Sequence, residues 1–230
     1  MKLSARPSEG ERALPLGGKA RSAKSTLTPP RIYLASKSPR RQELLRQLGV
    51  DFDVLSLREA PGRRRDVVEK PRPQETALDY VQRIAAAKAN VARRRMEQRG
   101  LTPMPVLGAD TEVVQGGVIF GKPADERDAI RMLALLSGRG HDVLTAIAIS
   151  WQGHRMVAVS TTRVALRRLT RAEIENYVAT GESFDKAGAY AVQGRAAAFI
   201  RRIEGSYSGV MGLPLYETAL MLAKVGLPVL

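Results

Sequence analysis

Two hairpin turns interrupt a series of alternating strand and helix patterns in this 230-residue chain. The tripeptide Gln115-Gly116-Gly117 separates two short apolar runs, and residues 151–154 separate two longer ones. Such tight turns join antiparallel strands, whereas strands that alternate with helices favour parallel pairing. A chain with both features is expected to build one sheet of mixed direction. We therefore predict an α/β fold with a mixed twisted sheet, flanking helices and a central cleft.

Apolar runs and helical periodicity locate the individual elements. The strand at residues 105–109 is expected to end before Asp110 and to resume at residue 112. Thr170 and Glu173 form a capping box for the fourth helix. No internal repeat or linker is visible, so residues 31–230 are expected to form one domain. Strands are expected at 32–35, 52–57, 105–109, 112–114, 118–120, 143–150, 156–167 and 197–203, and helices at 39–48, 74–98, 124–136, 171–179 and 214–224.

The composition excludes several classes of site. The chain has no cysteine, so disulfides and thiolate metal sites are excluded. Its two histidines, His141 and His154, argue against a histidine-based zinc centre or a Ser-His-Asp triad, although His141 alone remains a candidate acid or base. No apolar run approaches the roughly 18 residues that cross a bilayer, so no membrane partner is expected. The lack of a disulfide framework fits a reducing compartment, and we expect a cytoplasmic protein.

The formal net charge of +14 points to an acidic partner: nucleic acid, an anionic membrane or a polyanionic small molecule. Part of the charge lies in residues 1–30, whose composition predicts a disordered basic tail without the apolar core of a secretory signal. A second basic cluster at 58–72 includes Arg63, Arg64 and Arg65 and is typical of a surface loop. Neither cluster interleaves aromatic residues with its charges, so nucleic-acid binding is the minor alternative.

A helix start that carries two arginines is a candidate anion site. Ser38 is a suitable N-cap, Pro39 suits the first helical position, and Arg40 and Arg41 lie in the first turn. That placement opposes the helix dipole, which favours anions there by roughly 0.3–1 kcal/mol each. Backbone N–H groups, serine hydroxyls and two guanidinium groups would together bind a phosphate. The alternative is a solvated arginine pair at a helix end.

Four further side chains are candidates, each with an alternative structural role. Lys88 lies on the apolar face of the long helix, where it either extends along that face to water or meets an anion in a cleft. Asp110 is either a general base or metal ligand at a strand end, or a turn aspartate bonded to local N–H groups. Lys122 stands near a helix start or is a surface lysine. Gln193, in a small-residue-rich loop with Lys186, either reads a base edge or is an ordinary polar residue.

Seven motifs follow one another along the chain: S-x-S-P-R-R-x-x-L-L at 36–45, R-x-A-x-x-K-A at 83–89, GADT at 108–111, GKP at 121–123, SGRGHDVLTA at 137–146, DKAGAYAVQG at 185–194 and VMGLP at 210–214. In this order they resemble the Maf family of nucleoside-triphosphate pyrophosphatases, whose fold is akin to that of the inosine-triphosphate pyrophosphatases. The resemblance covers residues 31–230. The basic tail and the arginine-rich insertion depart from the family pattern, and nothing is carried over to them.

The resemblance implies hydrolysis of a nucleoside triphosphate between its α and β phosphates, which gives a monophosphate and pyrophosphate. It implies a divalent cation, Mg²⁺ or Mn²⁺, on the phosphate oxygens. Asp110 matches the proton acceptor that activates water, and with Lys88 and Lys122 it would form the catalytic set. Glu59 is a further match, to an acidic residue that assists the metal or the water, while the metal ligands are not assigned. The positions that match phosphate-facing residues are Ser38, Arg41, Lys88 and Lys122.

Three positions of this chain resemble one branch of the family, which acts on dTTP and UTP. They are Arg40, Thr111 and Gln193, where a branch that acts on 7-methyl-GTP carries tryptophan, glutamine and glutamate. Gln193 would pair with the acceptor–donor–acceptor edge of thymine or uracil. The resemblance therefore implies hydrolysis of dTTP and UTP, with house-cleaning of modified pyrimidine nucleotides as a possible extension.

Other readings of the chain stay open. The Maf family is also associated with septum formation and cell division, so one alternative is a regulator that acts by binding a partner through the basic tail. A 7-methyl-GTP pyrophosphatase is another. A homodimer is compatible with the sequence, which does not fix the oligomeric state.

Overall fold

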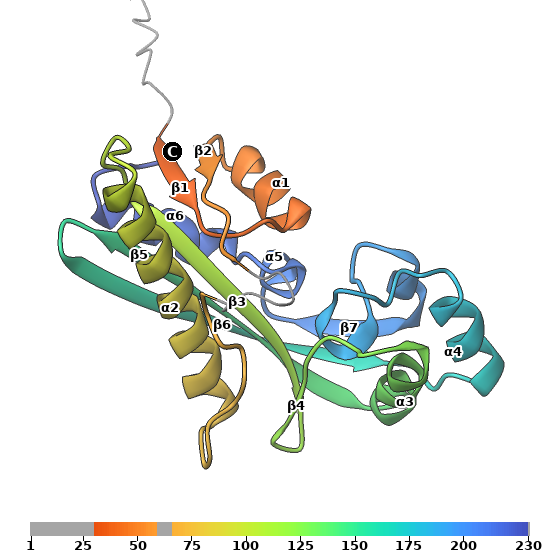
Figure 1. Cartoon of the computed structure of the whole chain (residues 1–230). Helices are drawn as coiled ribbons and strands as arrows, with labels where there is room; N and C mark the ends of the chain where they lie inside the picture. Colours follow the sequence, from red (N-terminus) through yellow and green to blue (C-terminus); the bar gives the residue numbers. More distant parts are fainter. Residues whose placement is uncertain (1–29, 59–65, 230) are drawn as a thin grey trace, which may run out of the picture.

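The computed structural model describes residues 30–58 and 66–229, which form a seven-stranded sheet with helices on both faces (Figure 1). The strand order is β2-β1-β3-β5-β6-β7, and β4 pairs with β3 outside this path. Strand β1 pairs in parallel with β2 and β3, and every other pairing is antiparallel. The prediction of a mixed sheet is confirmed. The strands are β1 (Arg31–Leu34), β2 (Asp51–Val54), β3 (Val106–Gln115), β4 (Val118–Phe120), β5 (Gly140–Trp151), β6 (His154–Leu166) and β7 (Ile200–Glu204).

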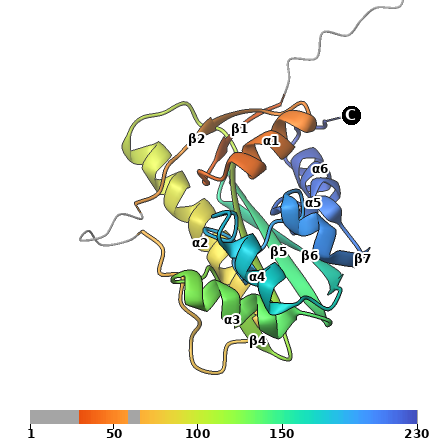
Figure 2. The ribbon, with the colours of Figure 1, turned by 90° about the vertical axis from the view of Figure 1, so that its right-hand side faces the viewer.

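The helices divide the core into parts on either side of the sheet. In Figure 2, α2 lies on one side of the central strands, and α5 and α6 lie on the other. The face that carries Leu107 and Ala109 packs against α1 and α6, and the face that carries Ala146 and Ala148 packs against α2. A further apolar cluster joins α3 and α4. The helices are α1 (Pro39–Gln47), α2 (Ala77–Gln98), α3 (Glu126–Leu136), α4 (Arg171–Val178), α5 (Tyr207–Met211) and α6 (Leu215–Lys224).

Helix starts follow the capping signals of the sequence. The Ser38 hydroxyl accepts from the Arg41 backbone N–H at the start of α1, and Thr170 and Glu173 form the expected capping box of α4. The long helix α2 starts at residue 77 rather than 74, because Thr76 is its N-cap. No helix in the described part of the chain has the length and apolar character that a bilayer crossing requires.

Strand β3 differs from the sequence prediction in a way that changes the site. It runs without a break through Asp110 and Thr111, since its pairing with β5 continues from Val106 to Val114. The polar pair therefore lies in mid-strand and not at a strand end. The expectation of a strand end there is wrong, because cross-strand pairing on β5 outweighs the low strand propensity of one aspartate.

Two other predicted segments have different outcomes. The strand expected at 197–203 begins later, at residue 200, and extends to residue 204. Residues 195–199 form a short 3₁₀ helix instead. The basic tail (1–30, of which Pro30 alone is described), Glu59 and the arginines at 63–65 lie outside the described residues. Those predictions stay predictions.

Gly108 sets the distance between α2 and the sheet. A Cβ atom at this position would lie 2.5 Å from the carbonyl oxygen of Ala85 and 2.6 Å from the amide nitrogen of Ala89. Both are backbone atoms of α2, so they cannot rotate away. The glycine thus allows the helix and strand β3 to touch, and this contact brings Lys88 of α2 beside Asp110.

We expect Gly108→Ala to destabilise the protein by about 1–3 kcal/mol or more, because the added methyl group must push α2 off the sheet. Urea unfolding measures the change. Gly121→Ala is the matched control, since a Cβ there has no neighbour within 4 Å among the described atoms. Equal stability of the two variants would contradict the account of this contact.

Candidate active site

One cavity of about 1040 Å³ brings together all eight side chains that the sequence predicts for the site. Its walls come from the loop before α1, from α2 and β3, from the segment after β4, and from the loops before β7 and α6. Segments far apart in the sequence thus share one hollow. The eight predicted residues that line it are Ser38, Arg40, Arg41, Lys88, Asp110, Thr111, Lys122 and Gln193.

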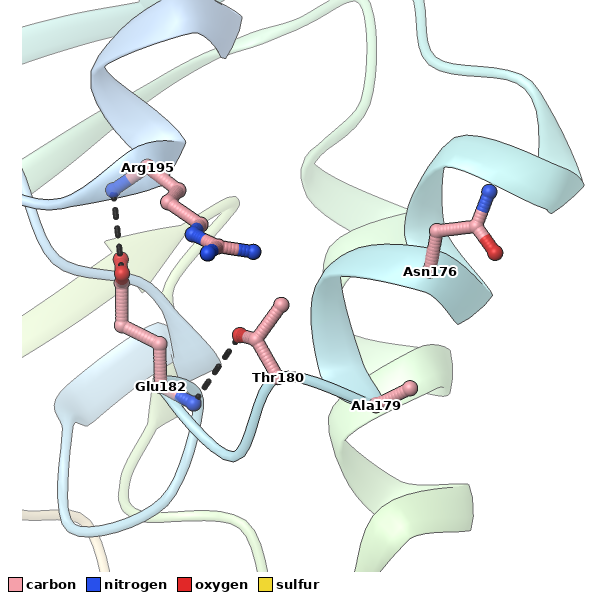
Figure 3. A pocket seen from close by; sticks show the side chains of 5 residues that line it. All are labelled: Asn176, Ala179, Thr180, Glu182 and Arg195. Carbon is pink, nitrogen blue, oxygen red and sulfur yellow. Dashed lines mark hydrogen bonds between the residues drawn. The ribbon is translucent and has the colours of Figure 1, made fainter.

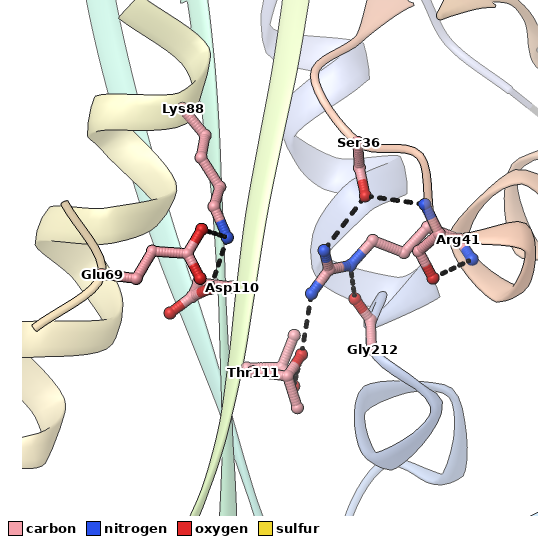
Figure 4. A network of polar contacts seen from close by, with 9 residues as sticks. Ser36, Arg41, Glu69, Lys88, Asp110, Thr111 and Gly212 are labelled. Atoms are coloured by element: carbon pink, nitrogen blue, oxygen red, sulfur yellow. Dashed lines mark hydrogen bonds and ion pairs between the residues drawn. The ribbon is translucent and has the colours of Figure 1, made fainter. Parts of the chain in front are cut away.

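A lysine between two carboxylates lies on one side of β3 (Figure 4). The Lys88 Nζ atom lies 2.8 Å from Asp110 Oδ1 and 2.9 Å from Glu69 Oε1. Burial alone would lower the pKa of Lys88, but the charges of Asp110 and Glu69 outweigh burial and raise it. Lys88 is therefore a fixed cation. The reading in which it extends to water is excluded, because its ammonium group meets anions inside the cavity.

One of the two carboxylate oxygens of Asp110 is buried without a partner in the described structure. Its residue is 5% exposed, and Oδ2 has no hydrogen-bond partner within residues 30–58 and 66–229. Burial raises the pKa of Asp110, while Lys88 opposes that rise. A carboxylate with one oxygen anchored and the other free, with a raised pKa, has the properties of a proton acceptor.

An arginine network lies on the other side of β3 (Figure 4). Arg41 donates from Nε to the Gly212 carbonyl oxygen (2.7 Å), from Nη1 to Ser36 Oγ (3.2 Å) and from Nη2 to Thr111 Oγ1 (3.1 Å). The Thr111 hydroxyl also lies 3.0 Å from that of Thr145. Arg41 thereby ties the loop before α1, strand β3 and the turn before α6 to one another.

The other predicted residues stand at the rim of the cavity. Arg40 is partly buried, and the charge of Asp185 acts on it. Lys122 and Gln193 are exposed to solvent, as a group that meets an incoming ligand would be.

His141 does not line the cavity: it is fully buried and its Nε2 lies 2.7 Å from the hydroxyl of Tyr190. Burial lowers its pKa to about 4, so the structure gives no support for His141 as acid or base.

Two carboxylates that line the cavity, Glu69 and Glu112, are not among the site residues that the sequence predicts. Glu69 pairs with Lys88, whereas the family resemblance named Glu59 as the acidic residue that assists the metal or the water. Glu69 follows the arginine-rich insertion and belongs to no motif, so no sequence signal identified it. Glu112 did carry a signal, because it lies two residues after Asp110 in a strand and so faces the same way.

The Glu112 side chain is isolated. Its residue is 8% exposed, its Oε2 is buried without a partner, and among the described residues its carboxylate has no hydrogen bond or ion pair. Burial, together with the charges of Asp110 and Glu69, raises the pKa of Glu112 to about 8, against the opposing charges of Lys88 and Lys122. No cluster of three close metal-ligating side chains is present in the part of the chain that the structure describes.

A second hollow, of about 450 Å³, lies beside α4 (Figure 3). Its one carboxylate, Glu182, accepts from the Tyr177 hydroxyl (2.9 Å) and from the Arg195 backbone N–H (3.0 Å). A carboxylate with these partners ties two chain segments together. We therefore assign Glu182 a structural role and do not treat the second hollow as a candidate site.

The family model and the named relatives agree on one family. The model of the family described as Maf-like protein matches residues 31–225. A protein of Nitrosospira multiformis named dTTP/UTP pyrophosphatase is 56% identical over 199 residues, which is 86% of this chain and 96% of that protein. Proteins of the same name from Cupriavidus metallidurans (53%; 85% and 97%) and Nitrosomonas europaea (51%; 86% and 96%) are also similar. Among solved structures, the Ham1 protein of Staphylococcus aureus is similar at a TM-score of 0.39 and 16% identity, over 59% of this chain and 71% of that one.

The isolated Glu112 predicts a pH-dependent stability. In the unfolded chain a glutamate titrates near 4.5, but in the folded protein Glu112 titrates near 8. Between these values the folded state holds a proton that the unfolded state has lost, so this group lowers the free energy of unfolding by about 1.4 kcal/mol for each pH unit of increase. Glu112→Gln removes the effect. Urea unfolding from pH 5 to 8 is expected to show that the variant gains stability relative to the unmodified protein as the pH rises, and a constant difference would contradict the assignment.

Proposed function

The chain belongs to the family of Maf-like proteins, and from this we propose that it hydrolyses dTTP and UTP to the corresponding monophosphate and pyrophosphate. The observation that carries the proposal is the single cavity in which a buried carboxylate with a free oxygen, Asp110, stands among the cations Lys88, Arg41 and Lys122. The relatives named dTTP/UTP pyrophosphatase are matched over nearly their whole length, which supports the same activity here.

Asp110 is the proposed proton acceptor. Lys88 holds Oδ1 at 2.8 Å, and the buried Oδ2, which has no partner among the described residues, is the proposed acceptor of a proton from the attacking water. The anhydride oxygen between the α and β phosphates leaves with the pyrophosphate. Such a general base contributes roughly 10²–10⁴-fold to a rate.

The cations of the cavity position the triphosphate. Phosphoryl transfer depends on positioned charge more than on covalent chemistry, because negative charge spreads over the phosphate oxygens in the transition state. Arg41 is fixed by three hydrogen bonds, and Lys122 at the rim is free to meet an outer phosphate. Ser38 and Arg40 at the start of α1 are the other proposed phosphate contacts.

A divalent cation, Mg²⁺ or Mn²⁺, is part of the proposal. The carboxylates Glu69, Asp110 and Glu112 all line the cavity, and such oxygen donors suit a hard cation. Lys88 makes ion pairs with Glu69 and Asp110 but not with Glu112 in the described structure. Mg²⁺ is usually held by one or two carboxylates together with substrate phosphates, and Glu69 is the proposed ligand at the mouth of the cavity. When bound, the cation would neutralise charge on the phosphate oxygens.

Base selection is assigned to the exposed Gln193, and Arg40 and Thr111, which also line the cavity, complete the set that the family resemblance links to pyrimidine nucleotides. Its amide offers both a donor and an acceptor to the edge of thymine or uracil. We extend the proposal to modified pyrimidine nucleotides and to a cytoplasmic location, where nucleotide pools are used. A homodimer stays a prediction.

Asp110→Asn is expected to lower the rate of pyrophosphate release from dTTP by roughly 10²–10⁴-fold, because the amide cannot accept the proton. A coupled pyrophosphate assay with Mg²⁺ measures the rate, and circular dichroism verifies the fold. Asp142→Asn is the matched control: it changes a partly exposed strand aspartate that pairs with Arg163 and does not line the cavity. Normal turnover by the Asp110 variant would remove this residue from the mechanism.

Gln193→Glu is expected to lower kcat/KM for dTTP and UTP by about tenfold or more, because the carboxylate loses the donor that meets a carbonyl of the base. A panel of nucleoside triphosphates that includes 7-methyl-GTP measures the change in preference. Gln115→Glu, in the hairpin outside the cavity, is the control. An unchanged preference would show that Gln193 does not read the base.

A further inference from the structure

Glu112 occupies a place where an apolar residue would be expected. It lies inside the central strand β3, opposite Leu144 of β5, and the same sheet face packs against the apolar side of α2. A polar group buried without a hydrogen-bond partner costs free energy, so such a position normally carries an aliphatic side chain. The buried carboxyl group therefore lowers the stability of the fold unless a cation binds to it during function.

The nearby cations of the protein leave this carboxylate unmatched. Lys88 is committed to Asp110 and Glu69, with contacts of 2.8 and 2.9 Å. Lys122 is exposed and forms no ion pair with Glu112 in the described structure. Glu112 is more than nine-tenths buried, and its Oε2 atom is buried without a partner among the described residues. The side chain lines the cavity in the same direction as Asp110.

We propose that Glu112 is a protein ligand of the divalent cation that enters the cavity with the triphosphate, in addition to Glu69. This inference rests on the proposed function, because the nucleotide phosphates supply the other ligands. A hard cation takes oxygen donors of this kind, and two carboxylates with phosphates and water suffice for Mg²⁺.

The test is the affinity for Mn²⁺ in the ternary complex. The probe is Mn²⁺ with a dTTP analogue that has a methylene group between the α and β phosphorus atoms, so that no bond is cleaved. The paramagnetic resonance signal of free Mn²⁺ reports binding. We expect Glu112→Gln to weaken Mn²⁺ binding by roughly tenfold or more, because loss of a direct ligand should cost at least as much as loss of a residue that only supports a ligand, which costs roughly ten- to a hundredfold. Binding of the analogue without Mn²⁺ is expected to stay unchanged.

Two controls make the result specific. Glu204→Gln changes an exposed glutamate of strand β7 and is expected to leave Mn²⁺ affinity unchanged. Glu112→Asp keeps the charge with a shorter side chain and is expected to retain more Mn²⁺ affinity than Glu112→Gln. The glutamine variant removes a buried charge, so it is expected to fold at least as well as the unmodified protein at pH 8.

The possible results separate this inference from the proposed function. If the unmodified protein releases pyrophosphate from dTTP while Glu112→Gln binds Mn²⁺ with unchanged affinity, the assignment of Glu112 alone is wrong. If Glu112→Gln weakens binding of the analogue equally with and without Mn²⁺, Glu112 acts on Lys122 or on the nucleotide, and its assignment as a metal ligand is again wrong. If the unmodified protein releases pyrophosphate from no nucleoside triphosphate, the proposed function fails and this inference fails with it.

Discussion

A single ammonium group between two carboxylates holds the candidate site together. Lys88 reaches Asp110 and Glu69 from a helix that could not lie so close to the sheet if residue 108 carried a side chain. Because the pair is buried, loss of the lysine would leave uncompensated negative charge, which typically costs roughly 3–5 kcal/mol. The charge balance of the cavity therefore depends on the close packing of α2 on β3, which brings Lys88 to the two carboxylates.

The second network extends the site across strand β3. Arg41 begins at the start of α1 and reaches β3 and the turn before α6, so that three segments far apart in sequence meet at one guanidinium group. Consecutive residues of a strand point to opposite faces, and Asp110 and Thr111 use both faces of β3. A cavity that touches both networks can present carboxylate oxygens and cations to one ligand. This combination suits a triphosphate with its metal better than it suits a neutral ligand.

The sequence predicts the mixed sheet well, because hairpin turns and helix caps are local signals. Gln115-Gly116-Gly117 and the Thr170 capping box both have the expected structure. The sequence also predicts that residues as far apart as Ser38 and Gln193 belong to one site, but that prediction came from the family resemblance. It does not predict the unbroken path of β3 through Asp110, since cross-strand pairing is non-local. It also does not predict Glu69, whose partner Lys88 becomes a neighbour only in the folded chain.

The most direct test of the account is a crystal structure of the protein with the methylene-bridged dTTP analogue and Mg²⁺. The triphosphate is expected to lie in the cavity between the Arg41 and Lys88 networks, with Asp110 Oδ2 facing the α-phosphorus atom through a water molecule. A nucleotide bound outside this cavity, or one whose α-phosphorus atom lies away from Asp110, would contradict it.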